Sequence, residues 1–143
     1  MEALMQIEGK GMGRILLMDD ERIIREILVK MLQFLGYTIF AARNGEEALD
    51  LFRLADEEGK PVRAAILDLI IDRGMGGRET AAELRKLNPA MPILVVSGYS
   101  NDPVMAAPRE YQFNDSLSKP FQSALLVSKL EYHMQKAEGA VVR

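Results

Sequence analysis

The chain has 143 residues, of which 48% are hydrophobic, with a formal net charge of −3 and no cysteine. This length is typical of a single domain, and the apolar content is too high for a disordered tail. The lack of cysteine excludes disulfides and thiolate metal sites, and without a basic cluster no direct nucleic-acid binding is expected. No apolar run approaches the roughly 18 residues of a membrane span, so no membrane contact is expected of this domain.

The first segment, residues 1–13, is interpreted as a flexible lead or linker. It is rich in glycine, carries the acidic residues Glu2 and Glu8, and lacks the apolar centre of a signal peptide. The folded domain is expected over residues 14–137, and residues 138–143 are interpreted as a tail.

The domain opens with an alternation of strand and helix patterns. The wholly apolar run 15–18 predicts a strand that is buried on both faces. Residues 21–35 repeat apolar side chains at spacings of three and four, which predicts an amphipathic helix, and Gly36 is suited to end it. Residues 37–42 predict a second strand. Asn44 then predicts the N-cap of a second helix.

The alternation continues through the middle of the chain. A third strand is expected over residues 62–67, and a glycine-rich loop over 72–77 leads to a third helix over 79–87. Residues 92–96 predict a fourth strand.

The fourth helix should be short or irregular. The pair Asp102 and Pro103 provides an N-cap followed by proline at the first helical position, but Pro108 removes a hydrogen bond one turn later. A weak fifth strand over 113–118 and a last helix that opens at Pro120 complete the pattern.

Five strand–helix units in succession predict an α/β fold with a parallel sheet covered by helices on both faces. Polar residues follow four of the strand-like runs: Asp19 and Asp20, Asp68, Ser97, and Lys119. Because the carboxyl ends of parallel strands lie along one edge, these side chains should meet in one pocket. Three crowded carboxylates repel one another unless a cation joins them, and a hydroxyl and an ammonium suit a phosphoryl group.

Four segments resemble the receiver domain of bacterial two-component response regulators: residues 17–21, 66–69, 96–98 and 119–121. Each segment alone is ordinary, as a helix cap, a loop acid, a turn or a helix start, but four in this order and at this spacing are specific. The resemblance implies a flavodoxin-like (βα)5 fold, a three-layer α/β/α arrangement whose five-stranded parallel sheet has the order 2-1-3-4-5.

The resemblance also implies roles for the polar residues. Asp68 would be the phosphoacceptor of a histidine–aspartate phosphorelay, with a histidine kinase or histidine phosphotransfer domain as partner. Asp19, Asp20, Asp68 and the backbone carbonyl of Ile70 would bind Mg²⁺ or Mn²⁺. Such a domain catalyses its own phosphorylation and dephosphorylation and is not a turnover enzyme.

Further residues are expected to bind or flank the phosphoryl group. Ser97 and Lys119 would contact its oxygens, and movement of Ser97 would be the conformational trigger. Gly98 would leave space beside the group. Ile70 cannot orient a water molecule for hydrolysis, and Tyr99 could cover its approach, so a long-lived phosphoryl group is expected.

The chain departs from the receiver pattern at several positions. Asp72 stands where many receivers have proline, in a loop that is one residue longer than the commonest version, and neither change is expected to touch the metal ligands. Ser116 replaces an aromatic switch residue, and Gln112 replaces a glycine that commonly ends the fourth helix. These changes predict that activation depends on loop rearrangement around Ser97 and Tyr99.

Two other functions stay open at this point. One is a phosphate-independent interaction module with the receiver fold. The more remote one is a haloacid-dehalogenase-type phosphotransferase, which needs a second acid two residues after the nucleophile, where this chain has Ile70. His133, the one histidine of the chain, is interpreted as a surface or boundary residue rather than a phosphodonor.

The context expected for this domain is cytoplasmic bacterial signalling. It would be a stand-alone receiver or part of a hybrid histidine kinase, including the cytoplasmic part of a membrane-bound sensor. Segments 74–80 and 97–105 favour the hybrid kinase. The last helices are a candidate dimer contact.

Overall fold

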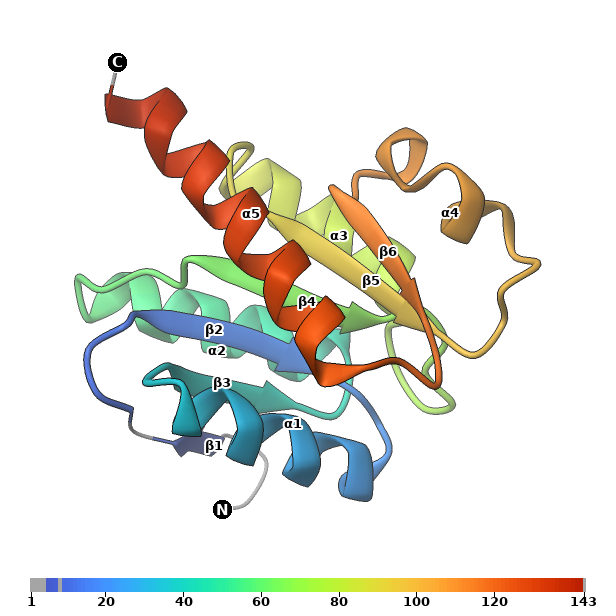
Figure 1. The fold of residues 1–143 in the computed structure, drawn as a ribbon, viewed down its shortest axis with the longest axis horizontal. Helices are drawn as coiled ribbons and strands as arrows, with labels where there is room; N and C mark the ends of the chain where they lie inside the picture. The colour runs from blue at the N-terminus through green and yellow to red at the C-terminus, as the bar shows by residue number, and fades with distance from the viewer. Residues whose placement is uncertain (1–4, 8, 143) are drawn as a thin grey trace.

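In the computed structural model, which describes residues 5–7 and 9–142 with side chains for 9–139, a six-stranded sheet lies between two layers of helices (Figure 1). The strands are β1 (Met5–Ile7), β2 (Arg14–Met18), β3 (Thr38–Ala42), β4 (Ala64–Asp68), β5 (Ile93–Ser97) and β6 (Asp115–Ser118). Their order in the sheet is β1-β3-β2-β4-β5-β6. The five parallel strands β2 to β6 therefore have the expected order 2-1-3-4-5.

The N-terminal segment differs from the interpretation as a flexible lead. Met5–Ile7 pairs antiparallel with β3 and adds a sixth strand to the sheet. Gly9 and Lys10 are also held, because the Gly9 N–H donates to Thr38 Oγ1 over 2.9 Å and the Lys10 N–H donates to Gly36 O over 2.8 Å. Met5–Ile7 thus cover the sheet edge that β3 would otherwise expose.

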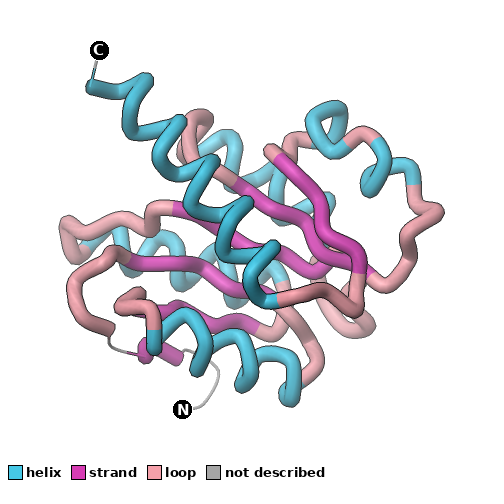
Figure 2. The backbone as a smooth tube through the Cα atoms, viewed as in Figure 1, coloured by secondary structure: helices cyan, strands magenta, loops and turns pink. Residues whose placement is uncertain are grey.

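Helices cover both faces of the sheet (Figure 2). They are α1 (Arg22–Phe34), α2 (Gly45–Glu57), α3 (Gly77–Leu87), α4 (Pro103–Ala106), the 3₁₀ turn η1 (Pro108–Tyr111) and α5 (Ser123–Val142). Helices α1 and α5 pack on one face, and α2, α3 and α4 pack on the other. The expected N-cap of α2 is confirmed, since Asn44 Oδ1 accepts the Glu47 N–H over 3.0 Å.

Strand β2 shows how the two cores are built. Ile15 and Leu17 pack with α1 and α5, whereas Leu16 and Met18 pack with α2 and α3. All four side chains are fully buried, as expected for a central strand of a parallel sheet. Each such burial contributes about 1.5–3 kcal/mol to folding, so the strand is fixed in register and its end is a rigid base for the residues that follow.

The segment from α4 to β6 is irregular, as Pro108 predicts. Helix α4 spans Pro103–Ala106, the turn η1 follows, and Gln112 adopts the left-handed conformation with φ of 80°. The guanidinium of Arg85 on α3 holds this segment, because it donates to the backbone oxygens of Pro89, Met91 and Gln112 and to Asn114 Oδ1. Asn114 Oδ1 also accepts the Ile93 N–H at the start of β5 over 2.8 Å.

Helix α5 extends through the residues interpreted as a tail and ends at Val142. Its last turns are tied to the residue that precedes β4 by an ion pair of 2.6 Å between Glu138 and Arg63. Among the described residues, no helix combines the length and the hydropathy that crossing a membrane requires.

Candidate functional site

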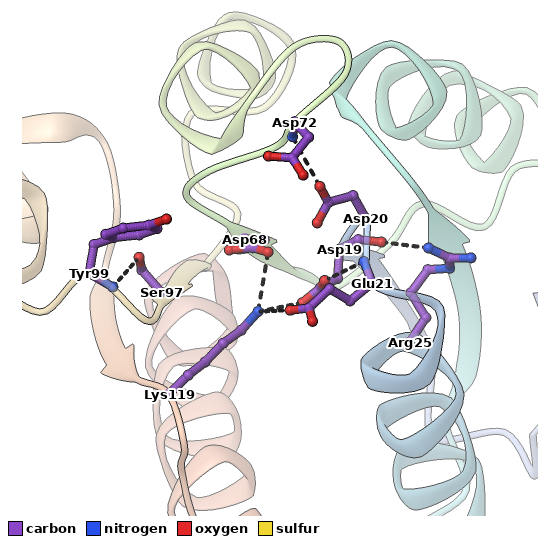
Figure 3. A network of polar contacts seen from close by, with 9 residues as sticks. All are labelled: Asp19, Asp20, Glu21, Arg25, Asp68, Asp72, Ser97, Tyr99 and Lys119. Carbon is purple, nitrogen blue, oxygen red and sulfur yellow. Dashed lines mark hydrogen bonds and ion pairs between the residues drawn. The ribbon is translucent and has the colours of Figure 1, made fainter.

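The polar residues that the sequence places at strand ends lie together at the carboxyl edge of the parallel sheet (Figure 3). Asp19 and Asp20 follow β2, Asp68 is the last residue of β4, Ser97 is the last residue of β5, and Lys119 follows β6. Backbone bonds extend the sheet into this edge: the Asp19 N–H donates to Ala42 O over 3.1 Å and the Lys119 N–H to Ser97 O over 2.8 Å. The sheet itself thus sets the spacing of these side chains.

Three carboxylates converge at this edge. Asp19, Asp20 and Asp68 each offer one oxygen, and these oxygens lie within 4.8 Å of one another. Asp19 is fully buried and Asp68 nearly so. Crowded carboxylate oxygens are the ligands that hard divalent cations prefer, so this donor set fits Mg²⁺ or Mn²⁺.

Lys119 is the counter-charge within the site. Its Nζ lies 2.8 Å from Asp19 Oδ2, 3.2 Å from Asp68 Oδ2 and 3.7 Å from Glu21 Oε1. The contact with Asp19 is thus shorter than the contact with Asp68. Asp19 is further fixed because its Oδ1 accepts the Glu21 N–H over 2.9 Å and its backbone oxygen accepts from Arg25 Nη1 over 2.8 Å.

The environment makes Asp68 unusually basic for a carboxylate. Burial and the negative charges of Asp19 and Asp20 raise the pKa of Asp68 to about 6, against the opposing effect of Lys119. Burial lowers the pKa of Lys119, but the two neighbouring aspartates outweigh it and raise that pKa above its usual value. Carboxyl groups with strongly shifted pKa values cluster at functional sites, which makes Asp68 a candidate functional residue.

The remaining predicted strand-edge residue, Ser97, lies near this acid cluster with the flanking residues Ile70, Gly98 and Tyr99. Ser97 is fully buried, and its Oγ accepts the Tyr99 N–H over 3.0 Å. Tyr99 is 65% exposed and Ile70 is 43% exposed, and both line an open cavity of about 450 Å³ together with Asp68. A Cβ added at Gly98 would meet no atom within 4 Å, so space is open there.

Asp72 belongs to the site, contrary to the expectation that it does not touch the metal ligands. Its backbone N–H donates to Asp20 Oδ2 over 3.0 Å, and the residue lines the same cavity as Asp20 and Asp68. The only sequence signal was the departure from proline at this position, because proline has no N–H to donate. Glu21 is a second addition, as its carboxylate contacts Lys119.

Comparison with known proteins assigns the chain to a family. The sequence pattern described as response regulator receiver domain matches residues 15–131. This chain belongs to the response regulator receiver domain family. Response regulator MprA of Mycolicibacterium vanbaalenii is 34% identical over 117 residues, which are 82% of this chain and 48% of that protein. MprA of Mycobacterium avium is 31% identical over 125 residues, 87% of this chain and 52% of that protein. The chain thus spans about half the length of these curated relatives.

Solved receiver structures share the fold. A CheY-like receiver domain of Methanospirillum hungatei superposes with a TM-score of 0.76 at 25% identity, covering 90% of this chain and 98% of that one. The response regulator TrrA of Thermotoga maritima, solved in complex with Mg²⁺–BeF, gives a TM-score of 0.71 at 32% identity and covers 85% of this chain and 99% of that one. The flavodoxin-like architecture expected from the four motifs is therefore confirmed.

The position at which the resemblance predicts an aromatic switch residue holds a short side chain that already has a hydrogen-bond partner. Ser116 is half-buried on β6, and its hydroxyl donates to the Met105 backbone oxygen on α4 over 2.8 Å. The serine therefore ties β6 to α4 instead of offering an aromatic ring that could change position.

His133 is buried in the receiver, which corrects its interpretation as a surface or boundary residue. It is 6% exposed, and its Nε2 lies 3.0 Å from Asp115 Oδ2. Asp115 also accepts from Lys129 Nζ over 3.1 Å, so one carboxylate on β6 joins two side chains of α5. The sequence could not show this burial, because the polar residues Lys129 and Lys136 lie one helical turn before and after His133. Which face of α5 is buried depends on how the helix packs against β6.

Proposed function

We propose that this receiver is a phosphoacceptor, in which Asp68 takes a phosphoryl group from the phosphohistidine of a histidine kinase or phosphotransfer protein. The position of the Asp68 carboxylate carries the proposal. It lies 3.2 Å from Lys119 Nζ, belongs to a carboxylate cluster within 4.8 Å, and lines an open cavity that an incoming group can enter.

The donor set supports a divalent cation at this site. Asp19, Asp20, Asp68 and the backbone carbonyl of Ile70 would hold Mg²⁺ or Mn²⁺, and the related TrrA receiver was solved with Mg²⁺–BeF. When bound, the cation supplies the positive charge that offsets repulsion between the carboxylates and the phosphoryl oxygens.

The side chains of the receiver would then position the transfer. The bond between an Asp68 oxygen and phosphorus forms as the nitrogen–phosphorus bond of the donor breaks, and the donor nitrogen keeps the bonding electron pair. The Lys119 ammonium would donate to one phosphoryl oxygen and the Ser97 hydroxyl to another, which stabilises the charge of the transition state. One phosphoryl group is taken up per chain, so the domain is not a turnover enzyme.

The signal would leave the site through Ser97 and Tyr99. Ser97 Oγ is already bonded to the Tyr99 N–H over 3.0 Å, so a shift of Ser97 towards a phosphoryl oxygen pulls on the loop that leads to α4. NMR of the labelled protein with Mg²⁺ and beryllofluoride should show changes at Ser97, Tyr99 and α4. An unchanged α4 region would contradict this route.

Phosphorylation by acetyl phosphate tests the proposal directly. In the presence of Mg²⁺, the intact mass should rise by one phosphoryl group, and Asp68→Asn should remove this increase. Binding of beryllofluoride to the wild type separates a phosphoacceptor from a phosphate-independent interaction module, which would bind none. A haloacid-dehalogenase-type activity is not supported, because Ile70 occupies the position of its second acid.

The partners and context follow from the proposed role. A phosphohistidine donor and a cytoplasmic location suit this function, in a stand-alone receiver or in a hybrid kinase. Segments 74–80 and 97–105 favour the hybrid context.

A further inference from the structure

The loop between β4 and α3 brings a fourth aspartate to the carboxylate cluster. Asp72 donates its backbone N–H to Asp20 Oδ2 over 3.0 Å and lines the same cavity of about 450 Å³ as Asp20 and Asp68. Figure 3 shows Asp72 on the side of the cluster that faces away from Lys119.

The direct ion pairs of the site lie on one side of the carboxylate cluster. Lys119 contacts Asp19, Asp68 and Glu21. Across the part of the chain that the structure describes, no ion pair reaches Asp20 or Asp72. Within this part, Asp20 and Asp72 are therefore held without a direct ion pair, and the cationic side chains that line a cavity with them are Arg43 and Arg73.

The loop that carries Asp72 is anchored to neighbouring elements. The Gly77 N–H donates to Leu69 O over 3.0 Å, which closes the base of the loop. The Met75 N–H donates to Glu46 Oε1 over 2.9 Å, and Met75 O accepts the Gly45 N–H over 2.8 Å, which ties the loop to the start of α2. Asp72 is thus held beside Asp20 before any ligand arrives.

We propose that Asp72 is a positioning residue of the cation site, whose N–H orients Asp20 and whose carboxylate binds water molecules on the divalent cation. The inference rests on the proposed function, because it concerns the same cation. Mg²⁺ retains several water molecules in protein sites, and carboxylates around the direct ligands strengthen its binding. A proline at this position would supply neither the N–H nor the charge.

Calorimetric titration of the 143-residue chain with MgCl₂ at low ionic strength tests this role. Asp72→Asn keeps the backbone N–H and removes the charge, and Asp72→Pro removes both. The dissociation constant should rise about tenfold for the asparagine variant and further for the proline variant. Asp56→Asn, which removes an exposed carboxylate from the last turn of α2, is the matched control and should bind like the wild type.

Thermal unfolding provides a second measurement, in which the effect of Asp72→Asn on the melting temperature should depend on whether Mg²⁺ is present. In EDTA, Asp72→Asn should melt at or above the wild-type temperature, because a negative charge beside Asp20 has been removed. At limiting MgCl₂ it should melt below the wild type, because it gains less from the cation. If Asp72 only supported the loop, Asp72→Asn would lower the melting temperature by the same amount in EDTA and in MgCl₂.

The outcomes separate this inference from the function on which it rests. If the wild type binds Mg²⁺, Asp68→Asn does not, and Asp72→Asn binds as tightly as the wild type, then only the role of Asp72 is overturned. If the wild type itself binds no Mg²⁺, the proposed cation site fails and the role of Asp72 fails with it.

Discussion

Lys119 Nζ lies 2.8 Å from Asp19 Oδ2 and 3.2 Å from Asp68 Oδ2, so a single ammonium is shared by two buried carboxylates. Replacing it leaves the fully buried Asp19 without a charged partner. Lys119→Met should lower the free energy of unfolding in EDTA by about 3 kcal/mol. Mg²⁺ should restore part of this loss, and urea unfolding in both conditions measures it. The exposed Lys60→Met is the control, and an equal loss with and without Mg²⁺ would refute the shared-charge interpretation.

Ile70 should slow the loss of the phosphoryl group. Its apolar side chain lines the cavity beside Asp68 and cannot orient a water molecule for attack on phosphorus. Ile70→Asn should therefore shorten the half-life of the phosphorylated protein several-fold, as followed by intact mass after removal of the donor. Ile70→Val keeps the side chain apolar and should leave the half-life near that of the wild type. Decay at the wild-type rate in the asparagine variant would exclude control by this residue.

Gln112 is strained by its backbone. It follows η1 with φ of 80°, a left-handed conformation that glycine adopts without the steric conflict of a Cβ. Since the bond from Arg85 reaches the Gln112 backbone oxygen, substitution by glycine retains that contact. Gln112→Gly should raise the free energy of unfolding by about 1 kcal/mol, measured by urea unfolding. A loss of stability would show that the glutamine side chain has a stabilising role.

The Asp115 cluster should make stability depend on pH in the acid range. Burial opposes ionisation of Asp115, but hydrogen bonds from His133, the Ser116 N–H and Lys129 outweigh it and lower its pKa below the usual value. A carboxyl whose pKa is lowered by folding stabilises the protein above its unfolded pKa, and this contribution is lost as the pH falls through the folded value.

Asp115→Asn should therefore destabilise the protein by about 1 kcal/mol at pH 7. The difference from the wild type should narrow below about pH 4, as measured by urea unfolding across this range. Asp56→Asn, at an exposed position of α2, should show no such trend. A difference that stays constant with pH would mean that the charge of Asp115 is not involved.

The parallel sheet and the residues at its edge could be predicted, because in this fold the place of a residue along an apolar run determines where it lies in the sheet. Apolar runs such as 15–18 specify a doubly buried strand, and the polar residue that follows each run must then lie at the sheet edge. Asp68 and Lys119 are 51 positions apart, yet the topology alone brings them within 3.2 Å. The interruption of the fourth helix was predictable for a similar local reason, the missing N–H of Pro108.

Other features depend on packing that the sequence does not encode locally. The pairing of Met5–Ile7 with β3 involves only three residues and has no periodic signal. The burial of His133 follows from the contact between α5 and β6, and the bond from Asp72 to Asp20 comes from a backbone N–H, which any residue except proline can offer.

The guanidinium of Arg85 gives the receiver one further property. It reaches four acceptors spread from Pro89 to Asn114, a stretch that includes β5 and the whole irregular region after it. If one of these acceptors moves away, the guanidinium shifts and its hydrogen bonds to the other acceptors are disturbed as well. The stretch should therefore unfold locally as one unit, and its backbone amide protons should exchange with solvent at a common rate. A lysine could not reproduce this, because its ammonium has no planar fork to span several oxygens.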